Sequence, residues 1–140
     1  MDDGIQITAL AFFPGSSEND AIAGDHKGRL YVSQDSGTTW LQSRQIANAG
    51  AITSIAISPG LDSDDTFFVG TERSGIFKTI DGGESYVEAN RGLPFSFRQK
   101  HFTFRTTGTS GPLIRKDEKN VLSIALSPTF EADGTVFATL

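Results

Sequence analysis

Two aspartates occupy the same place in two eight-residue segments, where a carboxylate could serve as an acid, a calcium ligand or a hydrogen-bond acceptor. Both segments read hydroxyl-x-Asp-x-Gly-x-hydroxyl-aromatic. In a turn, an aspartate accepts hydrogen bonds from backbone N–H groups and hydroxyls, and glycine supplies backbone angles that other residues resist. We therefore expect two hairpin turns whose final aromatic side chain packs between sheets. Their residues are Ser33, Asp35, Gly37 and Trp40, and Thr79, Asp81, Gly83 and Tyr86.

A further acidic cluster comprises Asp62, Asp64 and Asp65, and Glu131 and Asp133 take the same place in a later segment. Alternating carboxylates could bind calcium. A feature that recurs along the chain is more typical of turn chemistry, and the glycine and distal glutamate of an EF-hand are missing. We expect no metal here.

The other residues that could do chemistry are sparse. The chain has no cysteine, and its two histidines, His26 and His101, fall in different units. No glycine-rich phosphate loop follows a strand, and no Gly-x-Ser-x-Gly elbow occurs. We therefore expect no catalytic residue, no metal and no cofactor.

Basic residues gather in one segment of an otherwise acidic chain. Residues 91–119 hold seven of the twelve basic side chains and two of the seventeen acidic ones, which leaves five basic and fifteen acidic residues elsewhere. Phenylalanines at 95, 97, 102 and 104 alternate around a basic turn, a pattern that predicts a projecting hairpin. The candidates for binding a ligand or partner are Arg98, Lys100, His101 and Arg105. We favour the alternative, in which the phenylalanines seal the segment against the sheet and the cations are solvated.

The elements that must position these groups repeat along the chain. The matching segments are 7–14, 52–59 and 121–128, then 21–24 with 67–70, and 66–69 with 135–138. Two complete units and a partial third are therefore visible. The predicted strands are 6–13, 20–24, 29–33 and 39–46 in the first unit, and 51–58, 65–71, 75–80 and 85–89 in the second.

Each leading strand alternates large and small side chains, which suits a sheet that is packed on both faces. Four-stranded antiparallel units with two apolar faces predict an all-β fold of propeller blades. A β-sandwich is the competing fold, but it has no reason to repeat one pattern at a fixed period. The predicted divisions of this single domain are a first blade at 5–48, a second at 51–90, a basic insertion at 91–120 and a partial third blade at 121–140.

The two aspartate segments closely resemble the Asp-box, or BNR repeat, of sialidase-like propellers. The surrounding sequence is similar to Asp-box propellers of the photosystem II assembly factor and sortilin type. This resemblance implies that Asp35 and Asp81 are structural and lie away from any substrate. It also implies a non-catalytic binding or assembly module with a protein or carbohydrate partner.

Glycoside hydrolases with the same blade keep an enzymatic alternative open. A sialidase-like or xyloglucanase-like site needs two carboxyl groups, or a tyrosine nucleophile with an arginine cluster. The chain has no Arg-Ile-Pro segment near its start, and Tyr31 and Tyr86 fall in a strand and in an Asp-box. We therefore favour the binding module over the enzyme.

Charge and hydropathy restrict the partners further. The net charge of −5 at pH 7 argues against nucleic acid. The longest apolar runs have the length of a strand and predict no membrane span. The first residues lack the basic start of a signal peptide. We expect a soluble chain, and the compartment stays open.

The partial third unit raises the question of how the ring of blades closes. Propellers close with roughly four to eight blades, and fewer blades leave strand edges unpaired. We expect a segment of a larger propeller, because copies that each begin with a first strand do not supply the missing third and fourth strands. The alternative is a homo-oligomer in which the insertion supplies them.

Overall fold

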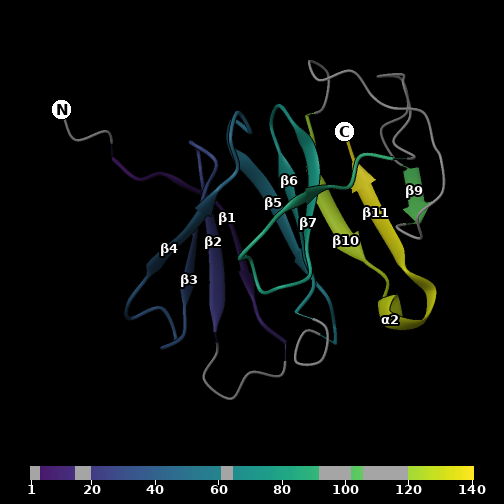
Figure 1. Ribbon diagram of the computed structural model, residues 1–140, viewed down its shortest axis with the longest axis horizontal. Helices are drawn as coiled ribbons and strands as arrows, with labels where there is room; N and C mark the ends of the chain where they lie inside the picture. The colour runs from purple at the N-terminus through teal and green to yellow at the C-terminus, as the bar shows by residue number, and fades with distance from the viewer. Residues whose placement is uncertain (1–3, 15–19, 61–64, 92–101, 106–119) are drawn as a thin grey trace.

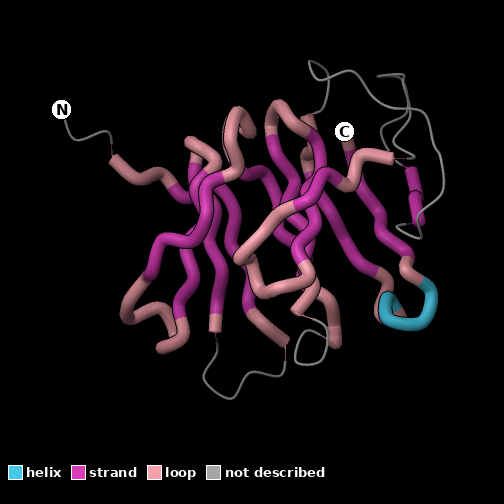
Figure 2. The backbone as a smooth tube through the Cα atoms, in the orientation of Figure 1, coloured by secondary structure: helices cyan, strands magenta, loops and turns pink. Residues whose placement is uncertain are grey.

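Three antiparallel β-sheets stack side by side along the chain (Figures 1 and 2). The computed structural model describes residues 4–14, 20–60, 65–91, 102–105 and 120–140, and for residues 102–105 it describes the backbone alone. Within these residues, the only helix is a single short turn. The predicted all-β fold with four-stranded antiparallel sheets is therefore confirmed.

The first two sheets have the same four-stranded order. The first comprises β1 (Ile7–Phe12), β2 (Ala21–Asp25), β3 (Arg29–Ser33) and β4 (Leu41–Gln45), paired in that sequence. The second comprises β5 (Ile52–Ile57), β6 (Phe67–Thr71), β7 (Gly75–Thr79) and β8 (Val87–Glu88). Both leading strands shift register at the same place, between Ile7 and Ala9 and between Ile52 and Ser54, so the repeat extends to the irregularities.

The third sheet contains one strand more than expected, and the extra strand comes from the insertion. Its order is β10 (Ser123–Leu126), β11 (Thr135–Thr139) and β9 (Phe102–Arg105). β9 pairs antiparallel with β11, where the complete sheets have their third strand. The expectation that this strand projects in a hairpin was therefore wrong, because it pairs with an edge that would otherwise be open. Residues 95–97, the expected partner strand, lie outside the described residues.

The outer strands are shorter than predicted because the aspartate turns take up their first residues. β4 was expected to begin at residue 39 and β8 at residue 85. The N–H groups of these two residues instead donate hydrogen bonds to Asp35 and Asp81 of the turns. The sequence also did not reveal the helical turn α2 (Phe130–Asp133), which connects β10 to β11.

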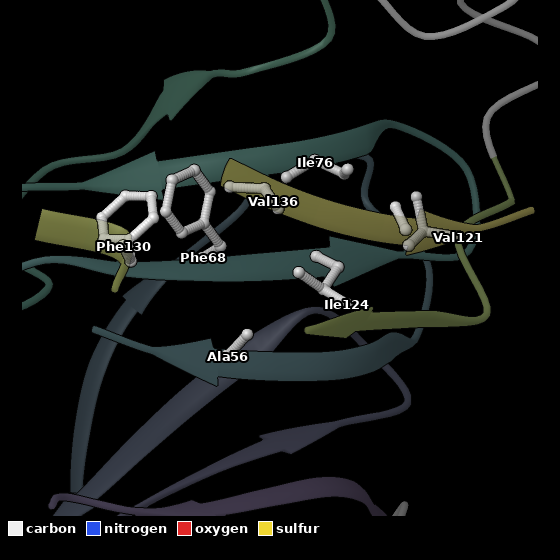
Figure 3. Close-up of a cluster of buried hydrophobic side chains, with 8 residues drawn as sticks. Ala56, Phe68, Ile76, Val121, Ile124, Phe130 and Val136 are labelled. Carbon is white, nitrogen blue, oxygen red and sulfur yellow. The ribbon is translucent and has the colours of Figure 1, made fainter. Parts of the chain in front are cut away.

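Two apolar clusters fill the spaces between neighbouring sheets. The alternation of the leading strands predicts this arrangement, since each sheet then presents apolar side chains on both faces. Figure 3 shows the cluster between the second and third sheets, in which the rings of Phe68 and Phe130 meet edge to face with centroids 5.6 Å apart. The cluster between the first and second sheets contains Ile22, Leu30, Ile46, Ala49, Ile52, Phe67, Val69 and Phe77. The cluster between the second and third contains Ala56, Phe68, Ile76, Val121, Ile124, Phe130, Val136 and Ala138.

A glycine on the second strand lets each following sheet approach closely. A Cβ atom on Gly24 would lie 2.5 Å from the Cβ of Ile52, and one on Gly70 would lie 2.8 Å from Cγ1 of Val121. Ile52 and Val121 are aligned positions of the repeat, and both side chains are completely buried. The second and third sheets therefore each begin with a β-branched side chain that fits over a glycine of the sheet before it.

We expect Gly24→Ala to destabilise the chain by about 3 kcal/mol, because the added methyl group overlaps a buried side chain that has no room to move. Urea denaturation measures this change. Gly4→Ala is the control, since a Cβ there meets nothing within 4 Å, and we expect it to change stability by less than about 0.5 kcal/mol. Equal stabilities of the two variants would contradict this account of the interface.

Candidate functional site

The first aspartate turn is closed by hydrogen bonds to the Asp35 carboxylate. Oδ1 accepts from the Ser33 hydroxyl at 2.9 Å and from the Thr39 N–H at 2.7 Å, while Oδ2 accepts from the Thr39 hydroxyl at 2.5 Å. Ser33 Oγ in turn accepts from the N–H of Gly37 at 2.8 Å, where the backbone has a φ of 86°. The left-handed backbone at this position explains the glycine of the motif.

The second turn repeats this network atom for atom. Asp81 accepts from the Thr79 hydroxyl at 2.7 Å, the Ser85 N–H at 2.9 Å and the Ser85 hydroxyl at 2.5 Å, and Gly83 N–H donates to Thr79 Oγ1 at 2.9 Å. The hydroxyl of Ser85 lowers the pKa of Asp81, and the hydroxyl of Thr39 lowers that of Asp35. A carboxyl group with a lowered pKa is ionised near neutral pH, so it accepts hydrogen bonds and has no proton to give.

The two aromatic residues that end the turns lie in different surroundings. Tyr86 is half-buried between the first two sheets and meets Phe67 edge to face, with ring centroids 6.1 Å apart. This burial raises the pKa of Tyr86 to about 12. Trp40 is 39% exposed and donates its ring N–H to the carbonyl of Gly37 at 3.1 Å. The aromatic position is thus used for packing between sheets where a neighbouring sheet is present.

Another carboxylate, that of Asp133, also holds a turn. Asp133 accepts from the N–H of Thr135 and the hydroxyls of Ser127 and Thr129, each at 2.8 Å, and these bonds, that of Thr135 first, lower its pKa to about 2. It belongs to the acidic cluster identified in the sequence. Asp65, from the matching cluster, has a φ of 46°, and Asp62 and Asp64 lie outside the described residues.

Asp25 was missed in the sequence, although it is completely buried. It accepts from the backbone N–H groups of Lys27 and Arg29, from Arg29 Nε at 2.6 Å and from the Tyr31 hydroxyl at 3.2 Å. Burial alone raises the pKa of Asp25, but the donors of Arg29 and Lys27 outweigh burial and bring the pKa below its ordinary value. The aligned position in the second sheet is Thr71, which also binds its own β6–β7 turn. The change from aspartate to threonine concealed this role from the motif search.

The basic candidates are not assembled into a described site. Arg98, Lys100 and His101 lie outside the described residues, and Arg105 ends β9 opposite Thr135, with its side chain outside the description. Within the part of the chain that the structure describes, no three histidine or acidic side chains come together as ligands for a metal ion.

A groove of about 510 Å³ runs between the outer strands of the first two sheets. It is lined by Arg44 and the connection that follows β4, and by Arg73 and Ser74 of the β6–β7 turn. The groove continues along β8 and includes the rings of Phe77 and Tyr86. Sequence reasoning did not find it, because its residues come from three separate segments, 44–48, 73–77 and 85–88, which no single motif joins. Its lining is completed by Gln45, Ile46, Ala47, Asn48, Ser85 and Glu88.

The groove presents more exposed cationic than anionic groups along its lining. Arg44 and Arg73 are both exposed, and Arg73 Nε lies 3.6 Å from a carboxylate oxygen of Glu72. Both partners of this ion pair are largely solvated, so it holds Arg73 weakly. Hydrogen bonds hold the walls of the groove together. Ser74 Oγ donates to the carbonyl of Asn48 at 3.0 Å, and Arg73 N–H donates to the carbonyl of Ala49 at 2.9 Å.

We expect Asp81→Ala to lower the urea midpoint at pH 7, because it removes three acceptor bonds from the turn. The lowered pKa means that the wild-type carboxylate stabilises the fold above pH of about 4, its ordinary pKa, and loses this contribution as the pH falls toward its folded pKa. The difference in urea midpoint between the variant and the wild type should therefore become smaller below pH of about 4. Glu84→Ala, an exposed acid in the same turn, should leave the midpoint near the wild-type value. A gap that does not change with pH would contradict the role of the ionised carboxylate.

Comparison with known proteins shows the fold. No family model matches the chain, and no curated protein matches it either. A solved structure described as YCF48 bound to D1 peptide is similar, with a TM-score of 0.52 and 13% identity, over 89% of this chain and 44% of that one. The computationally designed Ika8 protein matches with a TM-score of 0.48 and 16% identity, over 95% of this chain and 45% of that one.

The chain thus spans less than half the length of these two structures. Within the described residues, no helix is long and apolar enough to cross a membrane. The sheets of this chain are blades of a β-propeller, two of them complete and the third partial.

Proposed function

We propose that the chain is an Asp-box propeller segment that acts as a non-catalytic protein-binding module. The two aspartate turns support the Asp-box assignment, since both have the same donors on the same carboxylate oxygens. They hold the β3–β4 and β7–β8 hairpins at one end of the sheets. The connections between sheets lie at the opposite end, because each sheet is an antiparallel meander.

The observation that carries the proposal is the groove between the first two sheets. Its size suits a few residues of an extended peptide, and the rings of Phe77 and Tyr86 offer apolar contact beneath. Arg44 and Arg73 supply charged donors for a carboxylate of that peptide. The ligand class is therefore an extended protein segment with an acidic side chain.

A protein partner is also supported by the fold neighbour. YCF48 was solved with a D1 peptide bound. The turn aspartates give no support to hydrolysis, because glycosidases need a carboxyl group that is protonated at working pH. Asp35, Asp81 and Asp133 have lowered pKa values instead.

A selection from a random peptide-display library against the wild-type chain tests the proposal. We expect acidic peptides to be enriched, and Arg44→Glu and Arg73→Glu each to weaken the binding of a selected peptide by about tenfold, because the groove then repels the carboxylate. Fluorescence anisotropy measures the affinity.

Arg91→Glu is the matched control, since Arg91 is an exposed arginine that does not line the groove. We expect this variant to bind as the wild type does. Selected peptides that bind all three variants equally would place the binding surface elsewhere and overturn the groove as the site.

A further inference from the structure

The first sheet carries an open apolar face on the side away from the second sheet. Ile7 is 48% exposed, Leu10 54% and Phe12 64%. We call these three residues, together with Trp40, the β1 face. The aligned residues of the second sheet pack in the cluster against the first sheet, where Ile52 is buried and Ile55, Ile57 and Tyr86 are partly buried. The β1 face therefore has the composition of a surface that another sheet covers.

Both interfaces within the chain are built by the same rule. The first residue of the arriving sheet, Ile52 or Val121, occupies the space beside a glycine of the receiving sheet, Gly24 or Gly70. The arriving residue of the β1 face is Ile7, which aligns with these two. A sheet that receives the β1 face in the same way must offer a glycine beside Ile7.

The third sheet of this chain does not offer that glycine. Thr139 stands where the other two sheets have Gly24 and Gly70, as strand register shows directly. The pairs are Ala9 with Gly24, Ser54 with Gly70, and Ser123 with Thr139. A side chain at this position would collide with Ile7, since even a Cβ on Gly24 would come within 2.5 Å of the Cβ of Ile52.

The rest of the open face of the third sheet follows the pattern of a receiving sheet. Ser123 and Ala125 are small and exposed, as the leading strand of a receiving sheet requires, and Phe137 aligns with Phe68, which is buried against the third sheet. Thr139 thus departs from a pattern that Ser123, Ala125 and Phe137 follow.

We propose that the β1 face docks a β-sheet that presents a glycine on its second strand beside Ile7, and that Thr139 prevents a second copy of this chain from serving as that sheet. The partner is a propeller-type sheet from outside these 140 residues. This proposal continues the two interfaces already present in the chain, and it is independent of peptide binding in the groove.

Substitution of Thr139 tests the proposal, because Thr139→Gly turns the third sheet into the missing partner. Sedimentation velocity should show the wild type as a monomer and Thr139→Gly as a head-to-tail oligomer, with association at least tenfold tighter than that of the wild type. Adding Phe12→Lys to Thr139→Gly should abolish the oligomer, because the lysine blocks the β1 face. Adding Ile80→Lys should preserve it, since Ile80 is equally exposed but lies in the β7–β8 turn.

A second variant guards against a folding defect of Thr139→Gly. Ile7→Ala removes the side chain that collides with Thr139, so Ile7→Ala alone should form a head-to-tail oligomer, whereas a chain that carries both Ile7→Ala and Phe12→Lys should stay a monomer. A wild-type oligomer that Phe12→Lys dissolves would show that a second copy docks unaided and would overturn the proposal. Monomers of both Thr139→Gly and Ile7→Ala would overturn it as well.

Discussion

The close approach of one sheet to the next at a glycine is the contact on which the rest of the structure depends. Gly24 admits Ile52, and Gly70 admits Val121. Because these β-branched residues open the second and third units, the contact sets how each new sheet lies on the one before it. The two buried clusters then fill the space that remains between the sheets. A methyl group at either glycine would separate two sheets and open the core between them, and at Gly24 it would also widen the groove.

The two ends of the stacked sheets have different tasks. At one end, Asp35 and Asp81 use short hydrogen bonds to hold hairpins that need no partner. At the other end, the connections between sheets approach the β6–β7 turn, where Ser74 binds the carbonyl of Asn48. The hairpins thus hold the strands rigidly at one end, and the groove is built from separate segments that these strands support. This is the usual arrangement for binding on a repeat scaffold.

The accuracy of sequence reasoning depended on how local each feature is. The hydrogen bonds of an aspartate turn join residues at most four positions apart, so their pattern is readable directly from the chain. Asp25 bonds residues two to six positions away, yet it was missed because Thr71 replaces it in the next unit. The groove and the pairing of β9 with β11 join distant segments, and no local pattern encodes which strand edge an inserted strand will meet.

The sequence by itself determined the repeating units, the four-strand plan of the sheets and the two aspartate turns, because each follows from side-chain alternation and short-range hydrogen bonding. Only the tertiary structure decided that the insertion supplies the third strand of the last sheet and that Arg44 and Arg73 line one groove. It also decided the role of Gly24, Gly70 and Thr139 in the contact between neighbouring sheets. The role of Gly24 and Gly70 is visible only when Ile52 and Val121, which pack against them from the next sheet, are seen in place.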